Sequence, residues 1–228
     1  MHRPRGPGDW TVALTDLAAR LEKLYSAVVF DTMTSAGLTD RALPPEITSL
    51  YPGRKVAGPV WTLSGSMRSG VSIDDTLLSW TGFLSAAPPG QVIVCQPNDH
   101  TIAHMGELSA ETLQLRGIRG FVVDGGCRDV EMVNALEFPV FCRYATPADV
   151  SAGWMVDSMG EPVEIGALTI NSGDYVLGDA DGVVIIPAAQ AEAIVAEAEQ
   201  VANTEDALRE AIRQGEDPQE AYKRYRVF

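Results

Sequence analysis

The order of apolar and helical segments between residues 91 and 142 restricts the possible folds more than any other feature of this sequence. Three apolar runs, at Gln91–Gln96, Gly120–Val123 and Pro139–Cys142, alternate with helical patterns at Glu107–Leu115 and Val130–Leu136. Strands that alternate with helices in this way typically form parallel sheets through right-handed crossovers. The first run is apolar on both faces, as strands buried within such sheets are. We therefore predict an α/β fold with a parallel sheet at its centre.

The other segments predict an antiparallel portion and a long C-terminal helix. Apolar residues at helical spacing indicate one helix over Leu14–Ala36 and another from Pro187 to about Gln214. Further elements are a strand at Lys55–Leu63, a helix at Asp74–Phe83, and short hairpin strands at Pro162–Ile165, Leu168–Ile170, Tyr175–Leu177 and Gly182–Ile186. We expect a flexible tail over residues 1–12, one α/β domain over 13–214 and a polar tail over 215–228.

Composition excludes several classes of function. A formal net charge of −14 repels nucleic acid phosphates, so a general role in nucleic acid binding is disfavoured. The sequence contains no run of about 18 apolar residues, so no membrane span is expected. The first ten residues lack the apolar core of a signal peptide. We therefore expect a cytoplasmic protein. An anionic substrate would need positive charge supplied locally by its binding site.

The cysteines and histidines do not predict a transition-metal site. Three cysteines, at 95, 127 and 142, show no zinc-like spacing, and an odd number fits a reducing compartment. His100 and His104 are four residues apart, which would place them on one face of a helix, but they form no His-Glu-x-x-His motif. We expect Cys127 to pack as a small buried residue rather than to act as a nucleophile.

The strongest candidate for a functional site follows the strand at Gly120–Val123, where Gly125 and Gly126 precede Arg128 and Asp129. Ligands of open α/β sheets bind where strands end. The carboxylate of Asp129 is a ligand suited to a hard ion such as Mg²⁺ or Mn²⁺, or alternatively a cap for the following helix. The planar guanidinium of Arg128 suits a substrate carboxylate, or alternatively a structural salt bridge.

A second part of this site is expected at the start of the helix beginning at Glu107. The first amides of a helix lack partners within it, so the backbone of Gly106, Glu107, Leu108 and Ser109 predicts an anion site. The alternative is an ordinary capped helix end. The carboxylate of Glu107 is unfavourable there unless a cation offsets it. A metal ion with bound waters would do so, with Glu107 accepting a hydrogen bond from one of these waters.

These residues resemble the RraA-like family, whose signature is an acidic residue, twenty intervening residues and then Arg-Asp. Here the signature is Glu107 followed by Arg128-Asp129, and the segments Val123–Gly125 and Gly178–Val184 also fit. The resemblance covers roughly residues 14–205. The family includes class II 4-hydroxy-4-methyl-2-oxoglutarate or 4-carboxy-4-hydroxy-2-oxoadipate aldolases and the regulator of ribonuclease activity A.

The resemblance implies a β/β/α swivelling-domain fold that assembles as trimers or hexamers with sites between subunits. It implies that Asp129 binds Mg²⁺ or Mn²⁺, and that Arg128 and the backbone of Gly106–Ser109 hold a pyruvyl group. Glu107 stands where the aldolases often carry Asp, and its extra methylene of reach implies a difference in water positioning and in substrate. A neighbouring subunit's C-terminal helix also supplies an acidic residue in family aldolases, and the sequence does not choose among the candidates Glu192, Glu197, Glu199 and Glu205.

The function expected is therefore a metal-dependent lyase that cleaves a C–C bond of a 2-oxo acid to give pyruvate enolate, with oxaloacetate decarboxylase activity. Arg128, Glu107 and Asp129 are its expected catalytic residues. One alternative is a non-catalytic regulator that binds a ribonuclease or another protein, and a second is a related lyase or hydratase in biosynthesis. An older family label, demethylmenaquinone methyltransferase, is disfavoured because no Gly-x-Gly-x-x-Gly loop is present.

Overall fold

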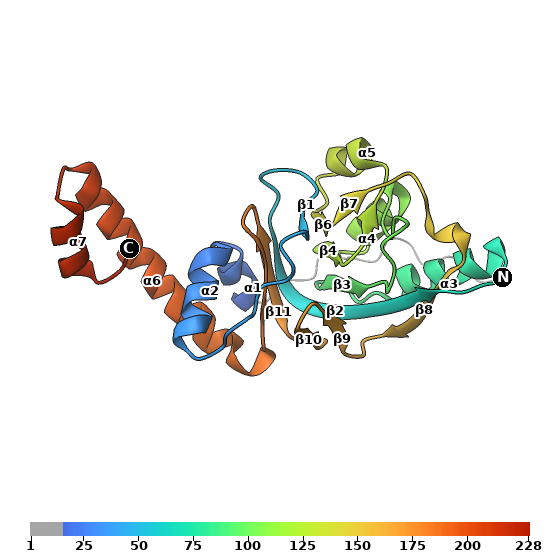
Figure 1. Ribbon diagram of the computed structural model, residues 1–228, viewed down its shortest axis with the longest axis horizontal. Helices are drawn as coiled ribbons and strands as arrows, with labels where there is room; N and C mark the ends of the chain where they lie inside the picture. The colour runs from blue at the N-terminus through green and yellow to red at the C-terminus, as the bar shows by residue number, and fades with distance from the viewer. Residues whose placement is uncertain (1–15) are drawn as a thin grey trace, which may run out of the picture.

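The computed structural model describes residues 16–228, and a curved mixed sheet of eight strands lies at its centre (Figure 1). Seven strands follow the order β1-β6-β4-β3-β2-β11-β12, and β8 pairs with β2. The pairs β2–β3, β3–β4 and β4–β6 are parallel, whereas β1, β8, β11 and β12 pair antiparallel. These strands are Thr48–Ser49 (β1), Val56–Met67 (β2), Val92–Gln96 (β3), Gly120–Val123 (β4), Val140–Cys142 (β6), Trp154–Met159 (β8), Tyr175–Asp179 (β11) and Gly182–Ile186 (β12).

This arrangement confirms the predicted mixed α/β fold with parallel and antiparallel portions. Two small strand pairs lie beside the main sheet. Gly126–Cys127 (β5) is parallel to Tyr144–Ala145 (β7), and Val163–Ile165 (β9) forms a hairpin with Leu168–Ile170 (β10). The first of these pairs directly precedes Arg128 and Asp129, and it therefore fixes the start of the candidate site.

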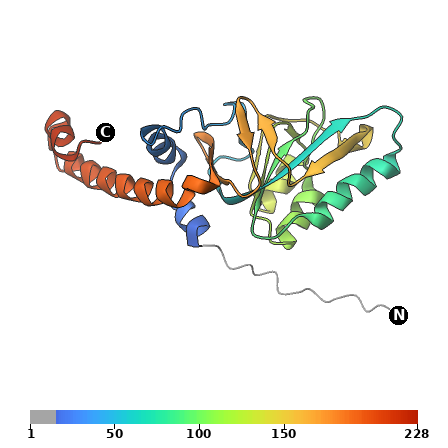
Figure 2. The same ribbon diagram turned by 90° about the horizontal axis from the view of Figure 1, so that it is seen from below.

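Helices cover the sheet in two groups. Figures 1 and 2 show α3 (Ile73–Ala86), α4 (Glu107–Leu115) and α5 (Val130–Ala135) on the part of the sheet built from β2, β3, β4 and β6. Trp80 and Phe83 of α3 and Leu113 of α4 are buried there against Ile93 and Phe121. The second group, α1 (Asp16–Leu21), α2 (Ser26–Ser35) and α6 (Ala191–Arg213), packs on β11 and β12. Short 3₁₀ helices span Val150–Ala152 (η1) and Ala188–Gln190 (η2).

The predicted single helix over residues 14–36 is wrong within the described residues, because it divides into α1 and α2. Lys55 Nζ donates hydrogen bonds to the carbonyl oxygens of Glu22 (2.9 Å) and Leu24. Asp179 accepts hydrogen bonds from the backbone N–H (2.7 Å) and hydroxyl (2.6 Å) of Ser26, where α2 begins. Both partners are distant in sequence, so helical spacing alone could not reveal the interruption.

The C-terminal region also differs from the prediction. α6 forms the predicted long helix and extends beyond the sheet (Figures 1 and 2). The expected polar tail contains another helix, α7 (Pro218–Tyr225), which packs back on α6; Leu208 and Ala211 of α6 and Ala221 of α7 are buried. Asp217 caps α7 by accepting a hydrogen bond from the N–H of Gln219 at 2.9 Å. The tail predicted over residues 1–12 lies outside the described residues.

Candidate active site

Arg128 and Asp129 are positioned by a loop that packs against the segment preceding α4. The N–H of Arg128 donates to the carbonyl oxygen of Met105 at 2.8 Å, and the N–H of His104 donates to that of Gly126 at 2.8 Å. The two predicted halves of the site, residues 106–109 and 128–129, are therefore held together by backbone hydrogen bonds.

Gly125 and Gly126 serve this packing. A Cβ atom on Gly125 would lie 2.6 Å from His104 Nδ1, and one on Gly126 would lie 2.4 Å from Tyr144 Cε2. Cys127 is fully buried, as expected, and burial raises the pKa of its thiol well above the ordinary value. These three residues therefore have a packing role in the loop that leads to Arg128 and Asp129.

Asp129 is the N-cap residue of α5, but its side chain caps a different helix. Its backbone is left-handed (φ 53°), and its carbonyl oxygen accepts a hydrogen bond from Val133 N–H at 2.9 Å. Its carboxylate turns toward α4, where Oδ2 accepts from the N–H of Glu107 at 3.1 Å and from Arg128 Nε at 3.3 Å. The alternative that the side chain of Asp129 caps α5 is therefore wrong.

Gly106 permits this close approach. A Cβ atom at position 106 would lie 2.7 Å from Asp129 Oδ2. The N–H of Glu107, one amide of the predicted anion site, is thus already bound by an anion that the chain supplies itself. The amides of Leu108 and Ser109 come next in the first turn of α4, where no carbonyl of the helix precedes them. The hydroxyl of Ser109 accepts a hydrogen bond from Trp80 Nε1 at 2.9 Å.

Arg128 forms a second ion pair that the sequence did not predict. Its Nη1 donates to Asp149 Oδ2 at 2.6 Å, while Nε faces Asp129. Desolvation opposes the charge of Arg128, but hydrogen bonds and attraction from Asp129 and Asp149 outweigh it and raise its pKa above the ordinary value. Hydrogen bonds from Ser151, together with Arg128, lower the pKa of Asp149. Arg128 and Asp149 therefore both carry charge at neutral pH.

A cavity of about 310 Å³ opens beside this ion-pair cluster. Arg128, Asp129 and Asp149 line one side of it. The remaining walls come mainly from α3, α4 and the segment before α4: Leu77, Trp80, Thr81, Leu84, Ala103, His104, Met105, Gly106, Leu108, Ser109, Thr112 and Val150. A more open hollow, lined in part by Thr146 and Pro147, shares Arg128 and Asp129 with it. The two residues thus stand where a small ligand has access to both.

Trp80 and His104 line this cavity, whereas Trp61, Arg68, Arg143 and Trp154 do not. The carboxylate of Glu107 is not part of the wall, although its backbone holds Asp129. Asp149 is the residue that sequence reasoning missed. An Asp two residues before a Ser indicates only a helix cap. Asp149 does cap η1, because it accepts a hydrogen bond from Ser151 N–H at 3.0 Å.

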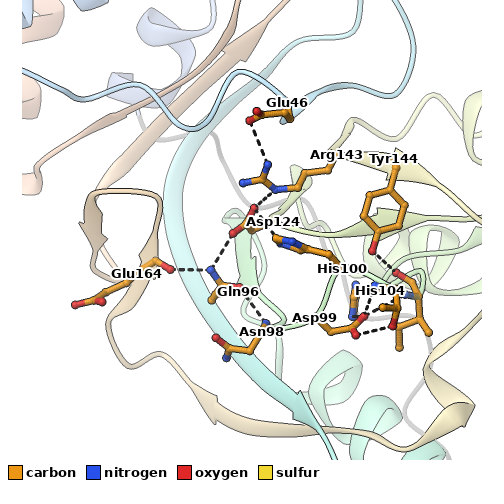
Figure 3. Close-up of polar contacts among 12 residues, drawn as sticks. Glu46, Gln96, Asn98, Asp99, His100, His104, Asp124, Arg143, Tyr144 and Glu164 are labelled. Carbon is orange, nitrogen blue, oxygen red and sulfur yellow. Dashed lines mark hydrogen bonds and ion pairs between the residues drawn. The ribbon is translucent and has the colours of Figure 1, made fainter.

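His100 and His104 lie in a loop (Figure 3). They are therefore not on one face of a helix, as their spacing of four residues had suggested. His100 Nε2 is 3.7 Å from Asp124 Oδ1, and His104 Nε2 is 3.6 Å from Asp99 Oδ2. Burial lowers the pKa of His104 to about 4, so its imidazole is neutral at pH 7. Within residues 16–228 no hydrogen-bond partner is found for either of its ring nitrogens.

Figure 3 also shows a second cluster at the ends of β3, β4 and β6. Asp124 accepts hydrogen bonds from Arg143 Nε and, at 3.0 Å, from Gln96 Nε2. Arg143 Nη1 also donates to Glu46 at 3.1 Å. The side chain of Asp124 is almost completely buried. Each side chain of this cluster forms a hydrogen bond with another side chain of the cluster.

The four C-terminal glutamates have different surroundings. Arg20 donates to Glu192 at 2.5 Å and to Glu199 at 2.8 Å, and Tyr25 donates to Glu205. Glu197 is exposed, and no contact of its carboxylate is found within the described chain. Glu197 is therefore the candidate whose carboxylate is least engaged within its own subunit.

Together these features define a mixed-sheet α/β protein with an Arg-Asp pair at a cavity beside a helix N-terminus. The sequence matches the RraA-like family, described as Aldolase/RraA, over residues 26–185. This chain belongs to the RraA-like family. A protein of Halalkalibacterium halodurans named "Putative 4-hydroxy-4-methyl-2-oxoglutarate aldolase" is 33% identical over 176 residues, which cover 77% of this chain and 80% of that protein.

Two solved structures share the fold. An uncharacterized protein from Pseudomonas syringae pv. tomato is 26% identical, with a TM-score of 0.84 and coverage of 98% of this chain and 100% of that one. RraAS2 of Streptomyces coelicolor, described as an unusual member of the RNase ES inhibitor RraA protein family, is 28% identical. Its TM-score is 0.76, with coverage of 91% of this chain and 98% of that one. Membership of this family and the aldolase name of the H. halodurans relative support assignment of the protein to the lyases.

No helix that the structure describes combines the length and apolar character needed to cross a bilayer.

Proposed function

We propose that this protein is a divalent-metal-dependent lyase that cleaves the C3–C4 bond of a 4-hydroxy-2-oxo acid and releases pyruvate. The observation that carries the proposal is the placement of Arg128 and Asp129 together on the wall of a cavity. The name of the H. halodurans relative supports the same type of reaction. The family signature, Glu107 with Arg128 and Asp129, is complete in this chain.

The donor chemistry at Asp129 fits a hard cation. The recorded hydrogen bonds of its carboxylate use Oδ2, which leaves Oδ1 for an ion. Among the described residues no group of three His, Cys, Asp or Glu side chains could hold a metal. Mg²⁺ commonly binds through one or two carboxylates and takes its other ligands from water and substrate. Asp129 is therefore the residue that would hold Mg²⁺ or Mn²⁺, and the ion would supply Lewis acidity at the 2-oxo group.

The protein's own residues then have distinct roles. The guanidinium of Arg128 binds the substrate carboxylate and stabilises negative charge that develops on the C2 oxygen as the C3–C4 bond breaks. The amides of Leu108 and Ser109 face an anionic substrate with the positive end of the α4 dipole. We assign to Glu107 the orientation of a water molecule that takes the proton from the C4 hydroxyl. Loss of CO₂ from oxaloacetate gives the same enolate, so decarboxylation is an expected second activity of this site.

The test is pyruvate release measured with oxaloacetate and with 4-hydroxy-2-oxo acids, at saturating Mg²⁺ and after complete chelation. Release that requires the added ion is expected, and re-addition of Mg²⁺ or Mn²⁺ should restore it. Equal turnover in the chelated and metal-loaded samples would contradict the metal dependence. Absence of pyruvate from every substrate would contradict the lyase.

The proposal includes a homo-oligomer, trimer or hexamer, in which a C-terminal glutamate enters a neighbouring subunit's site, and a cytoplasmic location. Glu197 is our first choice among the four glutamates because its carboxylate is exposed and unengaged within the described chain. Light scattering gives the oligomeric state. Mixing of Glu197→Gln and Asp129→Ala subunits should restore part of the activity if the two residues act across an interface.

A second candidate function, a regulator that binds a ribonuclease, is supported by the likeness to RraAS2. It predicts no pyruvate release and a direct effect on ribonuclease activity. The same pyruvate assay, accompanied by a ribonuclease inhibition assay, separates the two functions.

A further inference from the structure

The walls of the cavity divide sharply by polarity. Charge is confined to the side formed by Arg128, Asp129 and Asp149. The opposite walls are formed largely by apolar side chains, of which Trp80, Leu84 and Met105 are almost completely buried. A ligand held by Arg128 would therefore extend from a charged end into apolar surroundings.

We propose that the substrate carries an apolar alkyl or aryl group on C4 and no carboxylate beyond C4, an inference that rests on the proposed lyase function. This substrate class differs from the one in the name of the H. halodurans relative, because 4-hydroxy-4-methyl-2-oxoglutarate has a carboxylate at its distal end.

Electrostatics disfavours a distal carboxylate. Arg128 is the one cation among the described residues that line the cavity, and Asp129 and Asp149 already bind it. The pyruvyl carboxylate competes for the same guanidinium. A carboxylate beyond C4 would lie in the cavity without a cationic partner and near two aspartates, and an unpaired charge of this kind is strongly disfavoured in surroundings of low polarity.

The apolar walls favour the alternative. Trp80, Leu84 and Met105 form the buried part, and Leu77 stands closer to solvent with 43% of its surface exposed. Transfer of an alkyl or aryl group from water to such walls is favourable in proportion to its buried area. A volume of about 310 Å³ is within the range that small-molecule sites occupy. The cavity can thus accept a group the size of a phenyl ring beside the pyruvyl unit.

The reaction balances without a co-reactant. The C4 hydroxyl loses its proton, the C3–C4 bond breaks, and C4 becomes the carbonyl carbon of an apolar aldehyde or ketone. The electron pair of the broken bond passes to the pyruvyl unit as an enolate, which takes up one proton at C3 to give pyruvate.

The first experiment compares kcat/KM for 4-hydroxy-2-oxo-4-phenylbutanoate and 4-hydroxy-4-methyl-2-oxoglutarate, with oxaloacetate as a reference that has no substituent beyond C4. We expect the phenyl substrate to be favoured at least about tenfold. An equal or reversed preference would overturn the inference and leave the lyase function intact. Oxaloacetate turnover with neither aldol substrate cleaved would do the same. No pyruvate from any of the three would overturn both.

A binding measurement without turnover adds an independent result. Calorimetry with Mg²⁺ present compares 2-oxo-4-phenylbutanoate with 2-oxoglutarate, which share the 2-oxo acid and differ in the distal group. Tighter binding of the phenyl compound supports the inference, and tighter or equal binding of 2-oxoglutarate contradicts it.

Leu77→Arg and Leu78→Arg form a matched pair of variants on α3. Leu77 lines the cavity, whereas its neighbour Leu78 is 70% exposed and does not. Leu77→Arg should shift the preference toward the dicarboxylate by about tenfold or more, and Leu78→Arg should not change it. Thermal unfolding of both variants checks that they remain folded. An equal shift in both variants, or none in Leu77→Arg, would show that the apolar wall does not select the substrate.

Discussion

Two acid–guanidinium pairs follow the strands of this sheet, and they have opposite surroundings. Asp124 and Arg143 follow β4 and β6, and their side chains are only 6% and 19% exposed. Arg128 and Asp129 follow β5 and lie on the wall of a cavity. Their side chains are 36% and 34% exposed. The residue types are the same, so their surroundings distinguish the pairs.

The partners of each pair explain what the difference means. Both oxygens of Asp124 accept hydrogen bonds, from Arg143 and Gln96, and Arg143 also binds Glu46. A buried polar cluster satisfied in this way fixes the positions of strand ends. At Asp129 the recorded bonds use Oδ2, and the carboxylate faces the cavity. The first pair is suited to hold the sheet edge together, and the second to bind a ligand.

The largest effect is expected from Asp129→Ala. Loss of the proposed metal ligand should reduce metal-dependent pyruvate release by about 10³-fold or more, because charge stabilisation at the reacting oxygen is lost. Steady-state pyruvate assays at several Mg²⁺ concentrations measure the effect. Asp129→Asn is the matched control, since Asn tolerates the left-handed backbone (φ 53°) that makes Ala unfavourable. An Asn variant as active as the parent would contradict the role of Asp129.

Much of this comparison was predictable from sequence, because it depends on local patterns. The alternation of apolar runs and helices predicted β3, α4, β4, α5 and β6, and the spacing of Glu107 and Arg128 pointed to the candidate site. The tight packing at Gly125 and Gly126 is explained by the structure, where a Cβ atom would meet His104 and Tyr144, respectively.

The remainder depends on contacts between distant residues. The strand β8 was missed because Trp154–Met159 has no clear alternation, and its place depends on Gly65, where a Cβ atom would lie 2.1 Å from Trp154 Cζ2. Asp149 was missed because nothing near it in sequence relates it to Arg128. The side chain of Asp129 was assigned as a possible cap of the wrong helix, because the N–H that it accepts from lies 22 residues earlier.

The second prediction concerns the buried pair. Arg143→Met leaves the Asp124 carboxylate buried without its cation, which should destabilise the fold by about 3 kcal/mol. For a chain of this size the melting temperature should fall by roughly 6–12 °C. Differential scanning calorimetry measures the loss, and kcat/KM per folded molecule should remain near that of the parent. An unchanged melting temperature would remove the structural role from this pair.

The third prediction exchanges guanidinium for ammonium at both positions. Arg128→Lys should reduce kcat/KM by about 10²-fold, because a point charge cannot contact Asp149 and Asp129 while also binding a carboxylate as a planar fork does. Arg143→Lys is the matched control, and its main effect should be on thermal stability. If Arg128→Lys lowers thermal stability but leaves kcat/KM unchanged, Arg128 has a structural role like that of Arg143 and does not bind the substrate.

The smallest effect is expected at Gly106, where only the spacing between α4 and Asp129 changes. A Cβ atom at position 106 would lie 2.7 Å from Asp129 Oδ2, so Gly106→Ala must displace the carboxylate from the N–H of Glu107. We expect about a tenfold loss in kcat/KM with an increased Mg²⁺ requirement. Gly82→Ala in α3 is the matched control, because no atom lies within 4 Å of a Cβ there. Removing a glycine from a helix interior should stabilise that variant by about 0.5–1 kcal/mol and leave activity unchanged. Equal activity in the two variants would mean that the contact between α4 and Asp129 does not position the proposed metal ligand.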